Sequence, residues 1–380
     1  MNRCHAELWM PCWNPYNSTK MNRTRHHLLL IAITAILLGG CRRAVEPEQP
    51  TATLRWPTMS TLAEFSLPAP AATNLSRLQA VVASHFDEVE STLSLFRPTS
   101  DLARINSLGT AGADVPITDM TAEVVDYALR IARESRGAFD PTLAPLMACW
   151  GFRKKEGTVT APDAATLAAA RHRVGWAHLQ LTPRSSPENG PTLQMLMPEM
   201  QLDLGGIAKG YAVDRAFEAL RDMGETDFLI NLAGNMRAHG RPAPTRPGWR
   251  IGIRNPFAEG THFGTLVLAD GEGIATSGSY ERYVIIDGVR HGHILDPRNG
   301  RPVSGMIAVT VLATSAMEAD ALSTALFVLG PEAGAELLQA HPGCGAIFVP
   351  DVHPRRLRVT RGLKDRFRPE PAWRAVIDWL

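Results

Sequence analysis

Oxygen-bearing side chains gather in a stretch of the sequence with helical character. Ala316–Leu329 is predicted to be a helix because it is rich in apolar residues and stops at Gly330 and Pro331. Asp320 and Thr324 lie four residues apart and therefore share one face of that helix, with Ser323 beside them. A carboxylate with two hydroxyls suits a hard cation such as Mg²⁺, which keeps waters and binds substrate phosphates. The alternatives are a polar stripe that faces solvent and hydroxyls that bond back to the helix.

A second dense segment reads LDLGGIAKGYAVD and spans residues 202–214. Asp203 is predicted at the end of a strand, and a helix is predicted to begin after the two glycines. Free backbone N–H groups at a helix N-terminus suit a phosphate, and Lys209 in the first turn could reach the same anion. The spacing matches neither the dinucleotide fingerprint nor the P-loop. A packing turn with a surface lysine stays open as the alternative.

Two further polar segments follow predicted strands. His293 comes just before the turn at 296–300, where Asp296 could orient its ring. Residues 231–235 form the other turn, which could contact a ligand or merely cap the edge of a sheet. A buried histidine that is satisfied by a neighbour is the alternative for His293.

Taken in order, these segments resemble the FAD:protein FMN transferases, the ApbE family of flavin-transfer lipoproteins. The resemblance runs from about Thr58 to Phe367. It is carried by Asp203–Ala212, Asn231–Asn235, Ala275–Gly278, His293–Gly300 and Ala319–Thr324, with additional support from Arg136–Thr142 and Trp150–Phe152.

The resemblance implies a Mg²⁺-dependent transfer of FMN from FAD to a Thr or Ser hydroxyl of an acceptor protein, with release of AMP. The implied acceptors are flavin-bearing subunits of membrane redox complexes. The implied FAD contacts are Met59, Phe96, Thr142, Leu143, Ala144, Asp203, Lys209 and Ile294. The implied cation contacts are Gly206, Asp320, Ser323 and Thr324.

Three positions depart from the family pattern. Ser60 stands where the family has Gly, Phe96 where it often has Tyr, and Ser323 where some members carry Asp. His293 adjoins Ile294, so it is a candidate for the base that deprotonates the acceptor hydroxyl. Two other functions stay open: a periplasmic FAD pyrophosphatase, and a flavin-binding lipoprotein without turnover.

The amino terminus has the pattern of an export signal. Basic residues 23–27 precede an apolar run at 28–38 and then Gly-Gly-Cys41, which resembles a bacterial lipobox. Residues 1–40 are therefore predicted to be a signal peptide whose true start is Met21, because residues 1–20 look unlike an export segment. The sequence predicts a lipid-anchored protein on the periplasmic side of a bacterial membrane, with the choice of inner or outer membrane open.

The mature chain mixes helical and strand patterns without strict alternation. Helices are predicted along the apolar stripe from Leu75 to Phe96, over Asp119–Ser135, and from beyond Leu204 to near Gly224. Strands are predicted at Phe228–Leu232 and around residues 249–253. This order suggests an α+β fold of two mixed α/β subdomains that meet near residue 235, and the family adds FAD in a cleft between them.

The predicted boundaries are a linker at 41–57, a transferase domain at 58–370 and a tail at 371–380. A net charge of +1 argues against nucleic acid as a partner. Among five cysteines there is no CxxC pair, and Cys149 and Cys344 are predicted to be buried free thiols rather than a disulfide.

Overall fold

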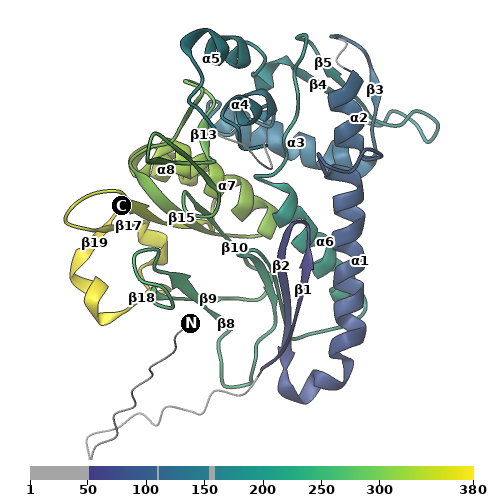
Figure 1. Ribbon diagram of the computed structural model, residues 1–380. Helices are drawn as coiled ribbons and strands as arrows, with labels where there is room; N and C mark the ends of the chain where they lie inside the picture. The colour runs from purple at the N-terminus through teal and green to yellow at the C-terminus, as the bar shows by residue number, and fades with distance from the viewer. Residues whose placement is uncertain (1–50, 109–110, 154–158) are drawn as a thin grey trace, which may run out of the picture. The chain divides into compact units, whose positions relative to one another are not determined.

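A nine-stranded sheet lies at the centre of the fold (Figure 1). The computed structural model describes residues 51–108, 111–153 and 159–380. The signal peptide, Cys41 and the proposed start at Met21 lie outside these residues. In sheet order the strands are β1 (Thr51–Thr58), β2 (Thr61–Pro68), β6 (Phe228–Leu232), β7 (Asn235–His239), β10 (Gly273–Gly278), β15 (Met306–Ala313), β16 (Gly345–Pro350), β17 (Leu357–Val359) and β19 (Ile377–Trp379).

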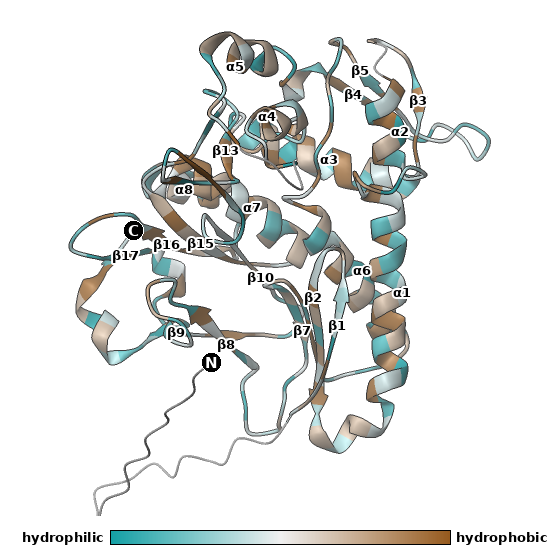
Figure 2. Cartoon of the chain, in the orientation of Figure 1, coloured by the Kyte–Doolittle hydropathy of each residue, from teal (hydrophilic) through white to brown (hydrophobic). Residues whose placement is uncertain are grey.

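The two faces of this sheet are covered differently. One face packs against the helices α1 (Leu75–Leu93), α3 (Asp119–Glu134), α6 (Ala208–Asp222) and α7 (Ala316–Leu329). The other packs against the three-stranded sheet of β8 (Trp249–Arg254), β9 (His262–Leu268) and β18 (Arg368–Pro369). Seven of the eight residues of β15 are therefore buried. The outer helix α1, by contrast, shows alternating hydrophobic and hydrophilic bands (Figure 2).

Smaller elements surround these layers. The remaining helices are α2 (Asp101–Leu108), α4 (Ala144–Cys149), α5 (Ala164–Arg171) and α8 (Pro331–Leu337). The remaining strands are β3 (Val115–Pro116), β4 (Leu179–Thr182), β5 (Thr192–Met195), β11 (Tyr283–Ile286), β12 (Val289–Gly292), β13 (Leu295–Asp296) and β14 (Arg301–Pro302). None of the described helices is long and apolar enough to cross a membrane.

The predicted helices are confirmed, and local chemistry explains their ends. Thr118 caps α3 by accepting from the backbone N–H of Thr121 at 3.2 Å. Ser315 caps α7 in the same way, and α7 ends at Leu329, before Gly330. The prediction that Phe96 belongs to the stripe of α1 is wrong. The helix ends at Leu93, and Phe96 lies beyond it with 67% of its surface exposed.

The α+β fold is confirmed, and both predicted strands form. Residue 235 lies in the hairpin of β6 and β7, which are paired along their whole length, so the halves on either side share one continuous sheet. The prediction of a strand ending at Asp203 is wrong, because residues 201–204 belong to none of the described strands.

The predicted domain limits differ from the structure at both ends. The linker predicted up to residue 57 overlaps β1, which pairs with β2 over eight residue pairs. The tail predicted at 371–380 contains β19, which pairs in parallel with β17. Cys149 and Cys344 are free, as predicted, but both are half-buried rather than fully buried.

Candidate functional site

The two motif helices, α6 and α7, meet at their N-termini. Gly210 in α6 packs so closely on α7 that a Cβ there would come within 2.3 Å of the carbonyl oxygen of Ala316. One turn later, the carboxylate of Asp214 accepts from the backbone N–H groups of Ala316 and Met317, both at 2.9 Å. The glycine permits the close approach and the aspartate caps the partner helix, so the two motifs form one rigid corner.

Asp320 lies in this corner with only 5% of its surface exposed. Its Oδ2 accepts from the N–H of Gly210 at 2.9 Å, and the Nζ of Lys209 lies 3.9 Å away. Burial raises the pKa of the Asp320 carboxyl, although Lys209 opposes the shift. The alternative of a solvent-facing polar stripe is therefore wrong.

Three hydroxyls lie together beside this carboxylate. The Oγ of Ser277, from β10, is 2.9 Å from the Oγ of Ser323 and 3.2 Å from the Oγ1 of Thr324. Ser323 also donates to the backbone carbonyl of Asp320 at 2.9 Å, so the alternative of a bond back to the helix holds for this residue. Ser277 lies in the motif Ala275–Gly278, but the sequence pattern alone predicts no role for it.

Gly206 completes the corner from the turn before α6. A Cβ at this position would lie 3.2 Å from the Oγ1 of Thr324 and 3.3 Å from the ring of Phe139. A larger residue would therefore crowd the hydroxyl group. The absent side chain lets the backbone of the turn approach α7, while the cation contact that the family pattern implies for Gly206 stays a prediction.

The donors in this corner fit a hard divalent cation. All of them are oxygens, from one buried carboxylate and neighbouring hydroxyls. Within the described residues, no group of three or more His, Cys, Asp and Glu side chains could hold a metal. A cation here would be held by few protein ligands and would need oxygens from waters and substrate phosphates, which is typical of Mg²⁺.

Asp203 lies at the mouth of the same turn. Its Oδ1 accepts from the N–H of Gly205 at 2.9 Å, and its backbone N–H donates to the carbonyl of Pro141 at 2.8 Å. The Nη2 of Arg153 lies 3.2 Å from its Oδ2, and the buried Nε of Arg153 has no hydrogen-bond partner. The sequence gave no separate signal for Arg153. Together with Lys209 it places positive charge where a diphosphate is predicted to bind.

The ring of His293 is half-buried and held by the backbone. Its Nδ1 lies 3.1 Å from the carbonyl oxygen of Arg282, so Nδ1 donates and Nε2 is left with a free lone pair. Burial, with the charges of Arg282 and Lys209, lowers the pKa of His293 to about 4. The predicted orienting role of Asp296 is wrong, because that carboxylate accepts from Arg298 at 2.8 Å through both of its oxygens.

The other predicted FAD contacts differ in how far the protein itself already satisfies or buries them. The Oγ1 of Thr142 is fully committed, since it donates to Asp140 at 2.6 Å and accepts from the N–H of Gly175 at 2.8 Å. Leu143 and Ala144 form the start of α4. Ile294 is 8% exposed and packs in the main core. Their arrangement around FAD stays a prediction.

Met59 and Ser60 form the two-residue turn between β1 and β2. Both have positive φ, 47° and 58°, a region that favours glycine. The replacement of the family's Gly by Ser60 therefore leaves the turn intact at a small cost in backbone strain. None of the hydrogen bonds between described residues links Met59 or Phe96 to the corner, so their flavin contacts also stay predictions.

The turn at 231–235 is held mainly by its own atoms. The Oδ1 of Asn231 accepts from the N–H of Gly234 at 2.9 Å, and its Nδ2 donates to Glu64 at 2.9 Å. Asn235 donates to the carbonyl of Leu232 at 3.2 Å, and its own Oδ1 is buried without a partner. Asn231 therefore fits the alternative in which this segment caps the hairpin. Asn235 keeps an unpaired acceptor, so a ligand contact stays open for that residue.

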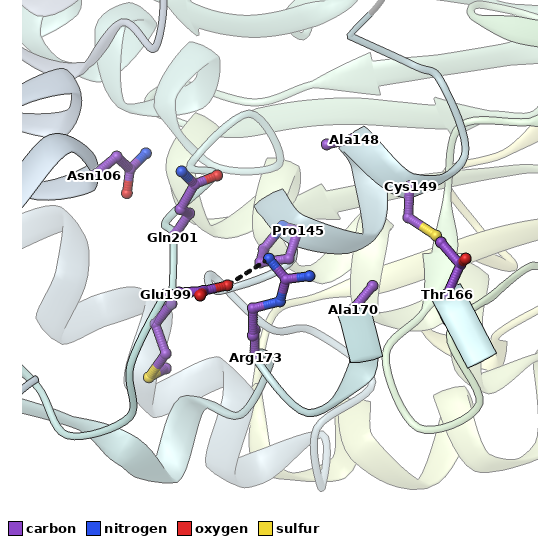
Figure 3. Close-up of a pocket in the computed structure, with 10 residues that line it drawn as sticks. Asn106, Pro145, Ala148, Cys149, Thr166, Ala170, Arg173, Glu199 and Gln201 are labelled. Atoms are coloured by element: carbon purple, nitrogen blue, oxygen red, sulfur yellow. Dashed lines mark ion pairs between the residues drawn. The ribbon is translucent and has the colours of Figure 1, made fainter. Parts of the chain in front are cut away.

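A cavity of about 390 Å³ lies beside α4 and α5 (Figure 3). It is lined by α4 and α5 residues and by residues 199–201, with an ion pair between Arg173 and Glu199 at 2.9 Å. None of the predicted site residues lines it. Its position next to α4 does not make it the catalytic site.

Comparisons with known proteins identify the family. The central mixed sheet and its covering helices define the chain as an α+β protein. A model described as the ApbE family matches residues 59–348, so the chain belongs to the ApbE family.

Curated relatives from several bacteria are named FAD:protein FMN transferase. The FAD:protein FMN transferase of Klebsiella pneumoniae is 33% identical over 311 residues, covering 80% of this chain and 87% of the relative. The FAD:protein FMN transferase of Treponema pallidum is 35% identical over 288 residues, covering 73% and 78%.

Solved structures show the same fold. The flavin transferase ApbE from Vibrio cholerae aligns with a TM-score of 0.73 and 30% identity, covering 83% of this chain and 99% of that one. The apo flavinyl transferase ApbE of Pseudomonas stutzeri aligns with a TM-score of 0.71 and 34% identity, covering 84% and 97%.

Proposed function

We propose that this chain is an enzyme that transfers FMN from FAD to a hydroxyl of an acceptor protein. The observation that carries the proposal is the α6–α7 corner, which gathers a buried carboxylate and three hydroxyls at the glycine-containing turn that we propose binds the diphosphate. In the reaction, the acceptor oxygen bonds to the phosphorus of the FMN half. The bond from that phosphorus to the bridging oxygen breaks, and AMP leaves with the bridging oxygen.

The donor set of the corner supports Mg²⁺ as the cofactor. Asp320, Ser323 and Thr324 would hold it together with the backbone at Gly206, and the substrate and water would supply the remaining oxygens. When bound, the ion would neutralise charge on the diphosphate and on the departing AMP. Lys209 and Arg153 add positive charge on the protein side, which would orient the same diphosphate.

His293 is our candidate for the base. Because Nδ1 donates to the carbonyl of Arg282, the lone pair of Nε2 is free to take the proton of the acceptor hydroxyl. Its pKa of about 4 keeps the ring neutral, and so able to accept a proton, at every pH above that value. A threonine or serine hydroxyl is a poor nucleophile without such help.

The proposal is tested with the purified mature chain, FAD, Mg²⁺ and a candidate acceptor domain from a membrane redox complex of the same organism. The expected result is an acceptor with covalent flavin fluorescence and one AMP released for each flavin attached. Cleavage of FAD to FMN and AMP with unlabelled acceptor would instead make the chain a pyrophosphatase. FAD binding that persists in EDTA with no AMP released would make it a passive flavin binder.

We also propose that Cys41 is lipidated and holds the enzyme on the periplasmic side of a membrane. The support is the sequence pattern of the signal and the lipobox-like segment alone. Replacement of Cys41 by Ser is expected to release the protein into the soluble or unprocessed fraction on cell fractionation. A variant that stays membrane-bound with unchanged processing contradicts the lipid anchor.

A further inference from the structure

The hairpin of β11 and β12 stands outside the central sheet as a two-stranded unit. Its turn, Asp287 and Gly288, has positive φ at both residues, 49° and 76°, as a tight hairpin requires. Ile286 is 4% exposed and packs with Trp150 of the α4 region, so one face of the hairpin is buried.

The opposite face of the hairpin carries Tyr283 and Ile285, which are 42% and 61% exposed. Ile285 pairs with Arg290 on that face, and the Arg290 guanidinium lies 4.1 Å from the centre of the Tyr283 ring. Val289 pairs with Ile286 and so lies on the other face, but beside the turn it is 57% exposed. We call Tyr283, Ile285 and Arg290, together with Val289 at the tip, the outer hairpin surface. Three large apolar side chains exposed within one short hairpin are typical of a protein contact surface with an arginine at its edge.

This surface is rigidly connected to the catalytic region. The hairpin ladder continues beyond its strands, because the N–H of His293 donates to the carbonyl of Arg282 at 3.0 Å. Arg282 in turn donates to the carbonyl of Phe152 at 3.0 Å, and His291 packs at 5.8 Å from the ring of Trp150. The strand that carries Val289 and Arg290 therefore leads directly to the proposed base.

We propose that the outer hairpin surface is the docking site of the acceptor protein. The inference rests on the proposed transfer to a protein hydroxyl, which requires a second protein to bring its hydroxyl to His293. FAD is a small molecule and needs no exterior apolar surface, whereas a macromolecular substrate does. The surface fits an acceptor with apolar side chains around the reactive hydroxyl, because burial of Ile285, Tyr283 and Val289 would then stabilise the complex.

The test uses the acceptor domain that the unmodified chain labels with FMN. Ile285→Glu and Tyr283→Ala are compared with Val352→Glu, a control that places the same charge at another exposed apolar residue, 44% exposed, beyond β16. Ile285→Glu is expected to raise the KM for the acceptor about tenfold or more, and Tyr283→Ala several-fold. Affinity for FAD, followed by flavin fluorescence, and the melting temperature are expected to stay unchanged.

Each other result overturns the docking proposal. An acceptor KM within twofold of the unmodified chain, or an equal rise with Val352→Glu, shows that the hairpin is not the contact. Lost FAD affinity shows that the hairpin supports the flavin site instead. A change in sedimentation of the enzyme alone with unaltered acceptor KM assigns the surface to self-association. Failure of the unmodified chain to label any acceptor contradicts the proposed function, and this is measured first.

Discussion

Two acidic residues of α7, Glu318 and Asp320, lie two positions apart but differ sharply in their hydrogen-bond partners and in the direction of their pKa shifts. The Oε2 of Glu318 accepts from the hydroxyl of Thr314 at 2.6 Å, and its Oε1 accepts from the Nδ1 of His341 at 3.0 Å. These bonds outweigh burial and lower the pKa of Glu318 to about 2. Asp320 has the N–H of Gly210 and a distant Lys209, and burial raises its pKa.

The comparison separates a structural carboxylate from a functional one. His341 lies between Glu318 and Glu134, with its Nε2 3.1 Å from the carboxylate of Glu134. The carboxylate of Glu318 therefore has its charge and hydrogen bonds satisfied by other groups of the protein. Asp320 is more deeply buried than Glu318 but has fewer hydrogen-bond partners, which costs stability unless a ligand supplies the missing ones. The carboxylate with too few partners thus lies in the corner where a cation and a diphosphate are proposed to bind.

The largest expected effect is that of Asp320→Asn. Removal of the Asp320 carboxylate is expected to lower the Mg²⁺-dependent transfer rate by about 10³-fold or more, because the cation contributes several kcal/mol. Since the raised pKa makes the ionised form unfavourable in the fold, the melting temperature without cation should stay the same or rise. Glu318→Gln, the matched change, should lower the melting temperature instead. Wild-type activity of Asp320→Asn in limiting Mg²⁺ removes the residue from the site.

The next effect concerns His293→Ala. Its transfer rate is expected to fall by about 10²-fold through loss of the base, with the dissociation constant for FAD little changed. In the unmodified enzyme, kcat/KM should hold down to about pH 4 and decline below it, because protonation of His293 begins there. The variant should lack this acidic limb. A loss of transfer that merely follows a loss of FAD binding makes His293 a positioning residue.

His341→Gln tests the structural side of the comparison. It is expected to lower the free energy of unfolding by about 2 kcal/mol near pH 6, because the half-buried Glu318 and the exposed Glu134 lose a charged hydrogen-bond partner. Its neighbours raise the pKa of His341 above 6.5, so the stabilisation is complete below pH 6.5 and is lost as pH rises through the folded value. Urea unfolding should therefore show a smaller difference between variant and wild type at pH 9 than at pH 6. Equal differences at both values contradict a charged clamp.

The smallest effect is expected for Ser323→Ala. Loss of one hydroxyl beside Asp320 removes about 1 kcal/mol of interaction, which corresponds to a roughly fivefold higher Mg²⁺ requirement. Titration of the transfer rate with Mg²⁺ measures this shift, and Thr92→Ala on the exposed side of α1 serves as the control. An unchanged titration shows that Ser323 serves only its contacts within the protein, with the carbonyl of Asp320 and the hydroxyl of Ser277.

Much of the fold follows from local sequence. The period of the apolar residues, Thr118 as an N-cap and Gly330 as a stop predict α3 and α7 closely, because these signals act within one or two helical turns. Spacing alone also places Asp320 and Thr324 on one helix face. The order of the polar motifs predicts the family.

The tertiary structure decided which polar groups are left open. Asp203 lies in a segment outside the described strands, Phe96 lies outside α1, and Asp296 pairs with Arg298 instead of orienting His293. Ser277 and Arg153 reach the site from distant parts of the chain, so no local pattern could find their contacts. Glu318 and Asp320 look alike in the sequence, since both are carboxylates on one helix. In the folded chain, His341 supplies a hydrogen bond to Glu318, whereas α6 supplies Asp320 with only the N–H of Gly210. Burial and hydrogen-bond partners depend on segments far away along the chain, so the sequence around α7 could not distinguish the two carboxylates.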